Sequence, residues 1–446
     1  MLLPVFRKRI TTSMAILLGF GLTILIGGLL LMLPICSRQG EMTPFLDAVF
    51  TSTSAVCVTG LVVHDTMTWW SPIGQALILI LIQIGGMGII TLSALVSMAA
   101  RRKIGMMQRA AIQDSIGGNQ LGGIVAMTLF IVKTMLLMEL GGAVLLSFRF
   151  IPRYGRWKGI GFSLFHAVSA FCNAGFDLMG EQGPFSSLTG FSSDVLVNLT
   201  VCILIILGGI GFFTWKDAAE YRFRVKRYRM QTKAVLLMSL ALILLPFLFF
   251  FSLEYQDLPL RERILSSFFQ SVTPRTAGFN TEDYAAMSGS GQALTIILML
   301  IGGSPGSTAG GMKVTTVFVI FAVFTSVFSR TGQPSAFGRG IPDAAIRQAV
   351  AILIVYLILF LTGGMIISGI EDLPLGTCLF ETASAIGTVG LTLGITSTLG
   401  RTSKLILILL MFIGRTGGLT IARAFIRDQM VTSQGRRYPM DSIAVG

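Results

Sequence analysis

Long apolar runs recur along the whole chain and are separated by short polar connections. A helix needs roughly 20 apolar residues to cross the hydrocarbon core of a bilayer. About eight runs meet this length, and they leave no stretch for a separate soluble domain. We therefore predict an all-α polytopic membrane protein. The runs lie near residues 14–33, 72–100, 124–148, 193–214, 233–253, 289–328, 346–369 and 402–425.

Shorter, weakly amphipathic segments lie between successive pairs of these runs, near residues 43–55, 161–173, 262–273 and 374–386. Each is too short to cross the membrane. A helix that enters and leaves by the same face is tolerated only where protein or a water-filled cavity shields its backbone. Four such segments predict four re-entrant pore helices around a shared central pore. The chain then divides into four parallel span-loop-span repeats in a pseudo-fourfold arrangement, with predicted limits 1–110, 111–230, 231–340 and 341–430 and a C-terminal tail 431–446.

Each short segment ends at a glycine that is followed by Leu or Phe, and these glycines are Gly60, Gly175, Gly278 and Gly390. Glycine tolerates backbone angles that are closed to other residues, so carbonyls beside it can turn toward one axis. One such glycine alone is typical of close helix packing. Four of them favour a ring of carbonyls that replaces the hydration shell of a cation. The candidate filter residues are Val58, Thr59, Gly60, Asn173, Ala174, Gly175, Thr276, Ala277, Gly278, Thr388, Val389 and Gly390.

Charge is scarce in this chain, at 12% of residues against 53% hydrophobic, yet the net charge is +13. In a soluble protein this charge would suggest nucleic acid, but here the basic residues follow every second run and indicate cytoplasmic connections. The short segments then enter from outside, both termini are cytoplasmic, and no nucleic acid partner is expected. One connection does not fit this orientation, because its basic residues would be external. These residues are Arg149, Arg153, Arg156 and Lys158.

The sixth run is interrupted by a stretch rich in glycine. Proline and repeated glycine disfavour a helix, so this stretch is irregular backbone at membrane depth and must line a cavity. The alternatives are a gate in the pathway and a passive hinge between two half-helices. The candidate gate residues here are Gly302, Gly303, Ser304, Pro305, Gly306, Ser307, Thr308, Ala309, Gly310, Gly311 and Lys313.

Arg415 interrupts the last apolar run. A buried guanidinium costs at least about 3 kcal/mol unless it is paired or wet. We therefore expect it to contact the glycine-rich stretch; the alternative is a snorkelling side chain near the membrane surface. Glu139 and Lys133 lie six residues apart in the third run and do not share a helix face. We expect them to pair with a neighbouring span and assign them no pore role.

No catalytic, metal-binding or nucleotide-binding motif stands out. The five cysteines are scattered and the two histidines, His64 and His166, have no HExxH-like companion, so we expect these histidines to make local hydrogen bonds. No nucleophile and base form a recognisable set, and no glycine-rich nucleotide loop follows a strand. We therefore expect that this chain is not an enzyme and that it binds no cofactor. An ion-coupled carrier working by alternating access stays as the alternative to a pore, although such carriers usually contain inverted repeats and intramembrane acids.

With these features the chain resembles the Trk/Ktr/HKT superfamily of potassium transporters, and most closely the bacterial Ktr membrane subunit. Thr388-Val389-Gly390 also matches the start of the TVGYG filter of potassium channels. The resemblance implies potassium uptake across the bacterial cytoplasmic membrane, a filter with one glycine per repeat, and a gate formed by the intramembrane loop and Arg415. It also implies a homodimer and a cytoplasmic ring of nucleotide-binding regulatory subunits of the KtrA type. Three loops depart from TVGYG, which leaves sodium as a second candidate ion or activator.

Overall fold

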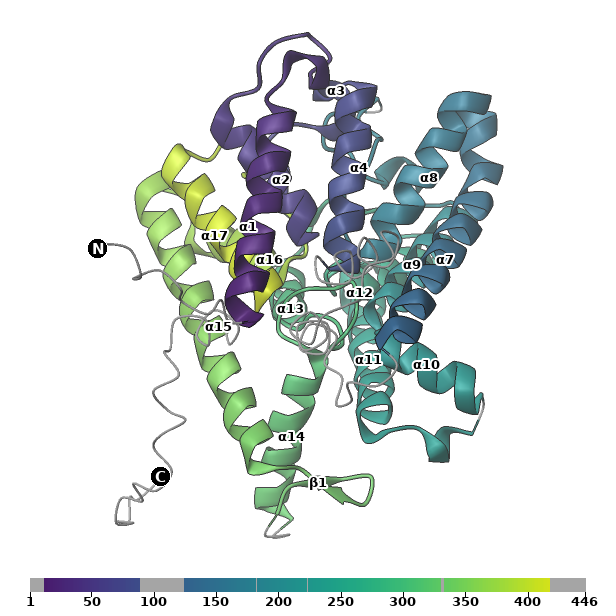
Figure 1. Cartoon of the computed structure of the whole chain (residues 1–446), viewed down its shortest axis with the longest axis vertical. Helices are drawn as coiled ribbons and strands as arrows, with labels where there is room; N and C mark the ends of the chain where they lie inside the picture. Colours follow the sequence, from purple (N-terminus) through teal and green to yellow (C-terminus); the bar gives the residue numbers. More distant parts are fainter. Residues whose placement is uncertain (1–11, 89–123, 182, 223, 330–332, 418–446) are drawn as a thin grey trace, which may run out of the picture.

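The computed structural model describes residues 12–88, 124–181, 183–222, 224–329 and 333–417, and almost all of its regular structure is helical (Figure 1). Each repeat contains an outer helix, a short pore helix and an inner helix, in that order. The first repeat contains α1 (Thr12–Leu31), η1 (Pro34–Cys36), α2 (Phe45–Cys57), α3 (Thr66–Trp69) and α4 (Pro72–Met87), and the second contains α7 (Ile124–Tyr154), α8 (Arg156–Cys172), η2 (Thr189–Phe191) and α9 (Val195–Gly209).

The third repeat is longer because its inner helix is split in two. A connection of α10 (Phe212–Tyr221) and η3 (Val225–Arg227) leads into it, and a short hairpin separates it from the fourth repeat. The third repeat contains α11 (Met230–Phe249), η4 (Phe250–Glu254), α12 (Leu260–Val272), η5 (Tyr284–Ala286), α13 (Gly289–Leu300) and α14 (Val314–Phe328). The hairpin consists of β1 (Ser335–Ala336) and β2 (Arg339–Gly340), and the fourth repeat contains α15 (Asp343–Glu371), α16 (Leu375–Gly387) and α17 (Arg401–Thr416).

The outer helices are the membrane spans that the hydropathy pattern predicts most clearly. In the described residues, four helices are long and apolar enough to cross a bilayer, namely α1, α7, α11 with η4, and α15. A fifth span results if α9 and α10, bent by 94°, count as one. The predicted runs 72–100 and 402–425 continue past residues 88 and 417, and their remainders lie outside the described residues, as do the boundary near residue 110 and the tail 431–446. The limits of the repeats therefore stay predictions.

The outer face of the first helix shows how such a span meets lipid. Leu18, Leu22, Leu25 and Leu29 of α1 are each at least 50% exposed and follow one another at spacings of three and four residues. This spacing places them on one stripe of the helix. In water such a stripe would be an unfavourable apolar patch, whereas in a bilayer it is the surface that contacts acyl chains.

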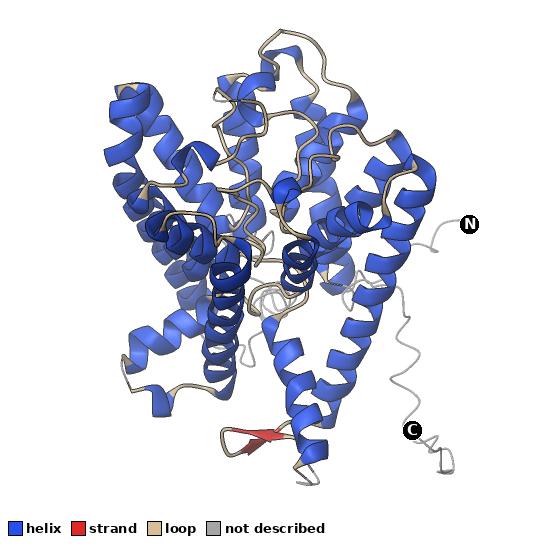
Figure 2. Ribbon diagram, turned by 180° about the vertical axis from the view of Figure 1, so that it is seen from behind, coloured by secondary structure: helices blue, strands red, loops and turns tan. Residues whose placement is uncertain are grey.

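The pore helices close the four repeats into a circle. Each pore helix packs against the inner helix of the repeat before it, and the first packs against the last. The two opposite views in Figures 1 and 2 show these short helices in the interior of the bundle, with α1, α7, α11 and α15 around them. This cyclic order confirms the predicted fold class. The pairs are α2 with α17, α8 with α4, α12 with α9, and α16 with α13.

The unexpected basic connection between α7 and α8 lies at the same end of the bundle as α3 and opposite α10 and β1 (Figure 1). Two of its four basic residues pair with a carboxylate, and a third lies over an aromatic ring. Arg149 Nε lies 3.1 Å from Asp194 Oδ2, Lys158 pairs with Glu181, and Arg153 lies 4.4 Å from the centre of the Phe191 ring. This connection stays an exception to the positive-inside rule, which counts Lys and Arg in short loops whether or not acidic residues lie nearby.

Candidate ion pathway

Gly60, Gly175, Gly278 and Gly390 form a closed ring at the centre of the four repeats. If a methyl group were added to any one of them, it would lie under 3.0 Å from a backbone carbonyl oxygen of the next loop. Any side chain at these positions would therefore collide with a neighbouring loop. The glycine and facing carbonyl in each case are Gly60 and Ala174, Gly175 and Ala277, Gly278 and Val389, and Gly390 and Thr59.

The backbone of each loop alternates in handedness. The ring glycines have positive φ angles of 92°, 68°, 81° and 95°, and so do the residues two positions earlier, whereas the residues between them do not. Such alternation gathers successive N–H groups on one side of the chain and so leaves the carbonyls on the other. A positive φ at a β-branched residue such as Val58 costs on the order of 1–3 kcal/mol and is typical of functional sites. The earlier residues are Val58 (56°), Asn173 (59°), Thr276 (71°) and Thr388 (51°).

Three pore helices end in the same hydrogen-bonded turn. In α2, Val58 N donates to Ala55 O at 3.2 Å and Thr59 N donates to Ser54 O at 2.8 Å, and the equivalent bonds close α8 and α16. This pair of bonds around a left-handed residue is the Schellman motif. In the third repeat the turn differs, because Ala277 N donates to Thr273 O at 3.0 Å. All four helices end at the ring, so the negative ends of their dipoles point at it and favour a cation there.

Hydroxyl groups behind the ring hold the loops in place. Ser54 Oγ accepts a hydrogen bond from Gly60 N, and Ser384 Oγ accepts one from Gly390 N, each at 3.0 Å. Ser169 Oγ donates to Phe176 O at 2.7 Å. These supports were not among the predicted site residues. The signal was present, since a serine precedes the glycine by six residues in three of the four repeats.

Two hydroxyls of the candidate filter have no hydrogen-bond partner among the described residues. Thr59 Oγ1 and Thr388 Oγ1 are fully buried and unbonded. Buried polar atoms are almost always satisfied, so these two oxygens have a lone pair to offer to a cation in the ring. Thr388 lies two residues before its ring glycine, and at the same position in the second and third repeats the Asn173 amide and Thr276 Oγ1 lie 3.2 Å apart and bond each other.

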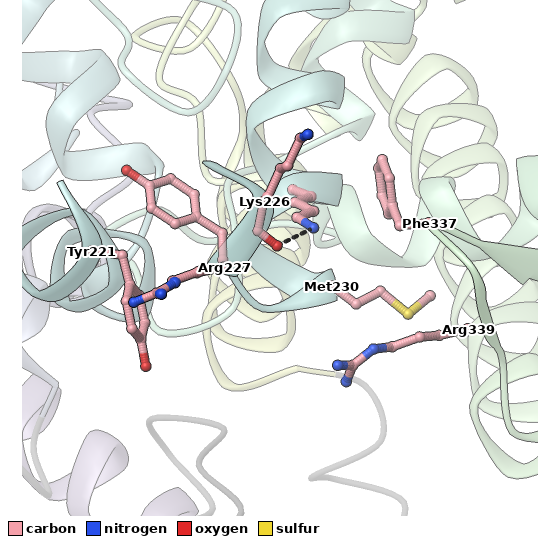
Figure 3. Close-up of a pocket in the computed structure, with 8 residues that line it drawn as sticks. Tyr221, Lys226, Arg227, Met230, Phe337 and Arg339 are labelled. Carbon is pink, nitrogen blue, oxygen red and sulfur yellow. Dashed lines mark hydrogen bonds between the residues drawn. The ribbon is translucent and has the colours of Figure 1, made fainter. Parts of the chain in front are cut away.

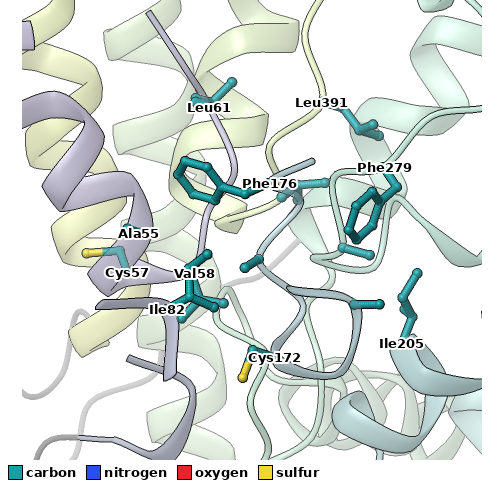
Figure 4. Close-up of a cluster of buried hydrophobic side chains, with 14 of the residues drawn as sticks. Ala55, Cys57, Val58, Leu61, Ile82, Cys172, Phe176, Ile205, Phe279 and Leu391 are labelled. Atoms are coloured by element: carbon teal, nitrogen blue, oxygen red, sulfur yellow. The ribbon is translucent and has the colours of Figure 1, made fainter. Parts of the chain in front are cut away.

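The apolar residues that follow the ring glycines anchor each loop in the core. Leu61, Phe176, Phe279 and Leu391 are at most 2% exposed. Figure 4 shows them on the loop segments that leave the ring, while Val58 and Cys172 lie where the pore helices end. Their burial explains the Leu or Phe that follows each glycine in the sequence.

The glycine-rich stretch between α13 and α14 is irregular, as predicted, and forms a loop from residue 301 to 313 that we call the intramembrane loop. Its two ends are bonded to each other, since Gly302 N donates to Met312 O at 2.8 Å and Val314 N donates to Gly303 O at 3.0 Å. A methyl group on Gly310 would lie under 3.0 Å from Thr388 Oγ1. The loop therefore packs directly against the candidate filter.

The second repeat holds the other side of the intramembrane loop. Ser304 N donates to Gly209 O at 2.9 Å, and Phe212 N donates to Gly306 O at 2.7 Å. Thr308 Oγ1 donates to Phe171 O, at the end of pore helix α8, at 3.0 Å. The sharp bend between α9 and α10 thus coincides with the place where the loop docks.

Arg415 makes the predicted contact with the intramembrane loop. Its guanidinium donates hydrogen bonds to Thr308 O and to Gly85 O of α4, and the side chain is half-buried. Lys313 adds a second cation, and its ammonium donates to Ala309 O at 2.7 Å. These contacts contradict the alternative that Arg415 snorkels to the membrane surface.

A glycine motif at the ends of the inner helices was missed by the sequence analysis. Methyl groups on Gly85, Gly208 and Gly414 would each lie under 3.0 Å from a carbonyl oxygen near the end of a pore helix. Residues 85–88 and 208–211 both read Gly-Gly-x-Gly, whereas residues 414–417 read Gly-Arg-Thr-Gly. Comparison of the repeats would have shown that Arg415 occupies a position filled by glycine elsewhere.

Glu139 joins a span to the back of the second pore helix. Gln83 Nε2 donates to Glu139 Oε2 at 3.1 Å, and Cys172 Sγ lies 3.7 Å from Glu139 Oε1. The predicted pairing with a neighbouring span is confirmed for Glu139, while Lys133 is exposed. Glu139 thus contacts Cys172, the residue before Asn173 of the candidate filter. The spacing between Glu139 and Lys133 in the sequence could not indicate this contact.

Both histidines make the local contacts that the sequence predicts. His64 Nε2 lies 3.2 Å from Asp47 Oδ2. His166 Nδ1 lies 2.7 Å from Phe162 O, and Leu178 N donates to His166 Nε2 at 3.2 Å. The hydrogen bond from Leu178 ties the loop segment after Gly175 to pore helix α8.

Apolar spans around four re-entrant loops define a multi-pass membrane protein with the architecture of a membrane transporter. Residues 22–433 match the family described as TrkH, cation transport protein, and the chain belongs to this family. The potassium/sodium uptake protein NtpJ of Enterococcus hirae is 41% identical over 99% of this chain and 98% of its own length. The Ktr system potassium uptake protein B of Bacillus subtilis is 38% identical over 98% and 97%. The crystal structure of the potassium transporter TrkH from Vibrio parahaemolyticus shares the fold, with a TM-score of 0.73 at 19% identity over 95% of this chain and 87% of its own.

Proposed function

We propose that this protein takes up potassium by conducting it through the ring of Gly60, Gly175, Gly278 and Gly390. The observation that carries the proposal is the closed ring, in which each glycine faces a carbonyl of the next loop. Rings of backbone carbonyls replace the hydration shell of a cation. The unbonded hydroxyls of Thr59 and Thr388 supply further oxygens. Relatives named as potassium or potassium/sodium uptake proteins support potassium as the ion and sodium as a second ion or activator.

The intramembrane loop is the proposed gate. It packs against Thr388 of the candidate filter, and Arg415 and Lys313 place two cations in the same region. A fixed positive charge raises the energy of a potassium ion nearby, most strongly where water is excluded. Release of the loop from Phe171 and Arg415, which both bond Thr308, would open the pathway. The competing role is a passive hinge.

The surroundings of the protein follow from its charge distribution and its relatives. Basic residues are exposed on α10, on η3 and at the start of α15. They support an orientation in which the end of the bundle formed by these elements faces the cytoplasm of a bacterial cell, with both termini on the same side. Relatives named as parts of a Ktr system support a separate regulatory partner. We extend the proposal to a homodimer of this chain and a ring of nucleotide-binding KtrA-type subunits, with nucleotide bound only by that ring.

Ion flux into liposomes tests the function. The purified protein would be reconstituted, and uptake of potassium, rubidium and sodium compared under defined gradients. A pore gives potassium flux down any potassium gradient without a second ion. Flux that requires a sodium or proton gradient and saturates at low potassium would overturn the pore and favour an ion-coupled carrier.

A further inference from the structure

A basic pocket lies at the end of the bundle formed by α10, η3 and the β1–β2 hairpin, far along the chain from any ring glycine. Its volume is about 310 Å³, and its lining residues come from the connection of α10 and η3, from the start of α11 and from the hairpin before the fourth repeat. Figure 3 shows Tyr221 and Arg227 on one side of it and Met230, Phe337 and Arg339 on the other. The lining residues are Tyr221, Lys226, Arg227, Tyr228, Met230, Lys233, Phe337 and Arg339.

The charge of this pocket is of one sign. Four lining residues are cations and none is a carboxylate. In the described part of the chain, no ion pair includes Lys226, Arg227, Lys233 or Arg339, although the neighbouring Arg229 pairs with Asp217 at 3.4 Å. Like charges that are held together without counter-charges destabilise a surface unless an anion binds among them. The five donors of each guanidinium suit the oxygens of a phosphate.

The pocket opens where a membrane span begins. Met230 and Lys233 lie in the first turns of α11, which is the start of the span Met230–Glu254. Leu237, Leu240 and Leu244 follow Lys233 at spacings of four, three and four residues and are 52%, 63% and 49% exposed. Lys233 and these leucines therefore share one face of the helix. A molecule with a phosphate at Lys233 would meet an apolar track directly below it.

We propose that this pocket binds the phosphate headgroup of an anionic phospholipid, with one acyl chain lying along Leu237, Leu240 and Leu244. The cations alone would suit any phosphate or an acidic peptide. The continuous apolar track favours the lipid, because a free anion or a peptide in water gains nothing from it. Basic pockets at the ends of membrane helices bind anionic headgroups for the same reason. The proposal does not depend on the proposed ion pathway.

Native mass spectrometry of the purified protein, titrated with short-chain phosphatidylglycerol, tests the site. Loss of two cations in K233Q/R339Q should weaken phosphatidylglycerol binding by about thirtyfold, at roughly 1 kcal/mol for each charge. The matched control K216Q/R347Q removes two exposed cations from α10 and α15 outside the pocket and should bind like the parent. Phosphatidylcholine should bind weakly to all three proteins.

Three results would overturn the proposal. Equal losses in the pocket and control variants would show only general attraction to charge. Displacement of the lipid by millimolar inorganic phosphate would assign the pocket to a free anion. Unchanged lipid binding in K233Q/R339Q, together with loss of an acidic partner protein, would assign it to that partner. Potassium flux in phosphatidylcholine liposomes is measured separately, so failure of the lipid site and failure of the transport function are distinguishable.

Discussion

Arg415 of α17 donates a hydrogen bond to the carbonyl oxygen of Thr308, which lies 107 residues earlier in the intramembrane loop. The same guanidinium also donates to Gly85 O at the end of α4. One side chain thus ties the loop of the third repeat to the inner helices of the first and fourth. The loop can move away from the filter only if this connection breaks.

Replacement of Arg415 by alanine should raise potassium flux by about tenfold or more, since a barrier lowered by about 1.4 kcal/mol speeds a step tenfold. Both the repulsive charge and the loop contact are lost. Arg415→Lys separates them, because lysine keeps the charge without the planar fork of donors. Flux like the parent in Arg415→Lys would assign the effect to charge, and flux like Arg415→Ala would assign it to the loop contact. Rubidium uptake into liposomes measures all three proteins, and slower flux in Arg415→Ala would contradict a gating role.

Serine in place of Gly278 should lower the preference for potassium over sodium. Its side chain would collide with Val389 O and would restrict a φ angle of 81° that favours glycine. Gly376→Ser on the exposed start of α16 is the control, since a methyl group there meets nothing within 4 Å. Competition between rubidium and sodium measures the preference. The filter assignment would be wrong if both variants selected ions like the parent.

Removal of the Ser384 hydroxyl should loosen the fourth loop. In Ser384→Ala the buried N–H of Gly390 loses its acceptor, at a cost of about 1–3 kcal/mol. We expect a lower midpoint of thermal unfolding and a weaker preference for potassium. Ser252→Ala, at an exposed hydroxyl after α11, serves as control. A fall in stability with unchanged selectivity would show that the serine supports the fold without shaping the filter.

Uptake should depend on external pH through Asp177, two residues beyond Gly175. Burial, opposed by the hydrogen bond from Met179 N and reinforced by the charge of Asp65, raises the pKa of Asp177 to about 7. The carboxylate is charged above this pH and attracts cations to the outer side of the ring, whereas below it the group is neutral. The apparent KM for potassium should therefore rise as pH falls from about 8 to 6, with little change in maximal rate.

Asp177→Asn tests this dependence, because asparagine cannot ionise. It should show the high KM at all pH values in this range, while the control Asp257→Asn, at an exposed outer position, should keep the pH dependence of the parent. An unchanged pH profile in Asp177→Asn would place the titrating group elsewhere.

Hydropathy alone predicted most of the architecture, because each membrane span is recognisable in the sequence by its length and apolar composition. The first run, 14–33, matches α1 (Thr12–Leu31), and the irregular stretch falls between Leu300 and Val314 as its proline and glycines indicate. The start of α8 was predicted five residues late, since its first turn contains Arg156 and Lys158 and gives no apolar signal. Polar residues at a helix start are invisible to a search for apolar runs.

The candidate site was predicted less completely. The ring glycines are visible in the sequence because four loops repeat the same ending, and the structure brings all four together. The contacts of Glu139 and the docking of Thr308 on Phe171 join segments that are far apart in the chain. No local pattern specifies such contacts, since they arise only when the repeats pack.

The closed glycine ring is built from one polypeptide, so one gene encodes all four quarters of the ring separately. In a pore assembled from four identical subunits, a single codon change alters every quarter of the ring at once. Here the same change alters one quarter and leaves three intact, so each loop can diverge on its own. The four repeats of this chain differ in this way: the inner helix is split in the third repeat, and the fourth has Arg415 where the first two have Gly86 and Gly209. A gene of this kind can acquire an asymmetric control element without disturbing the symmetry of the conducting centre.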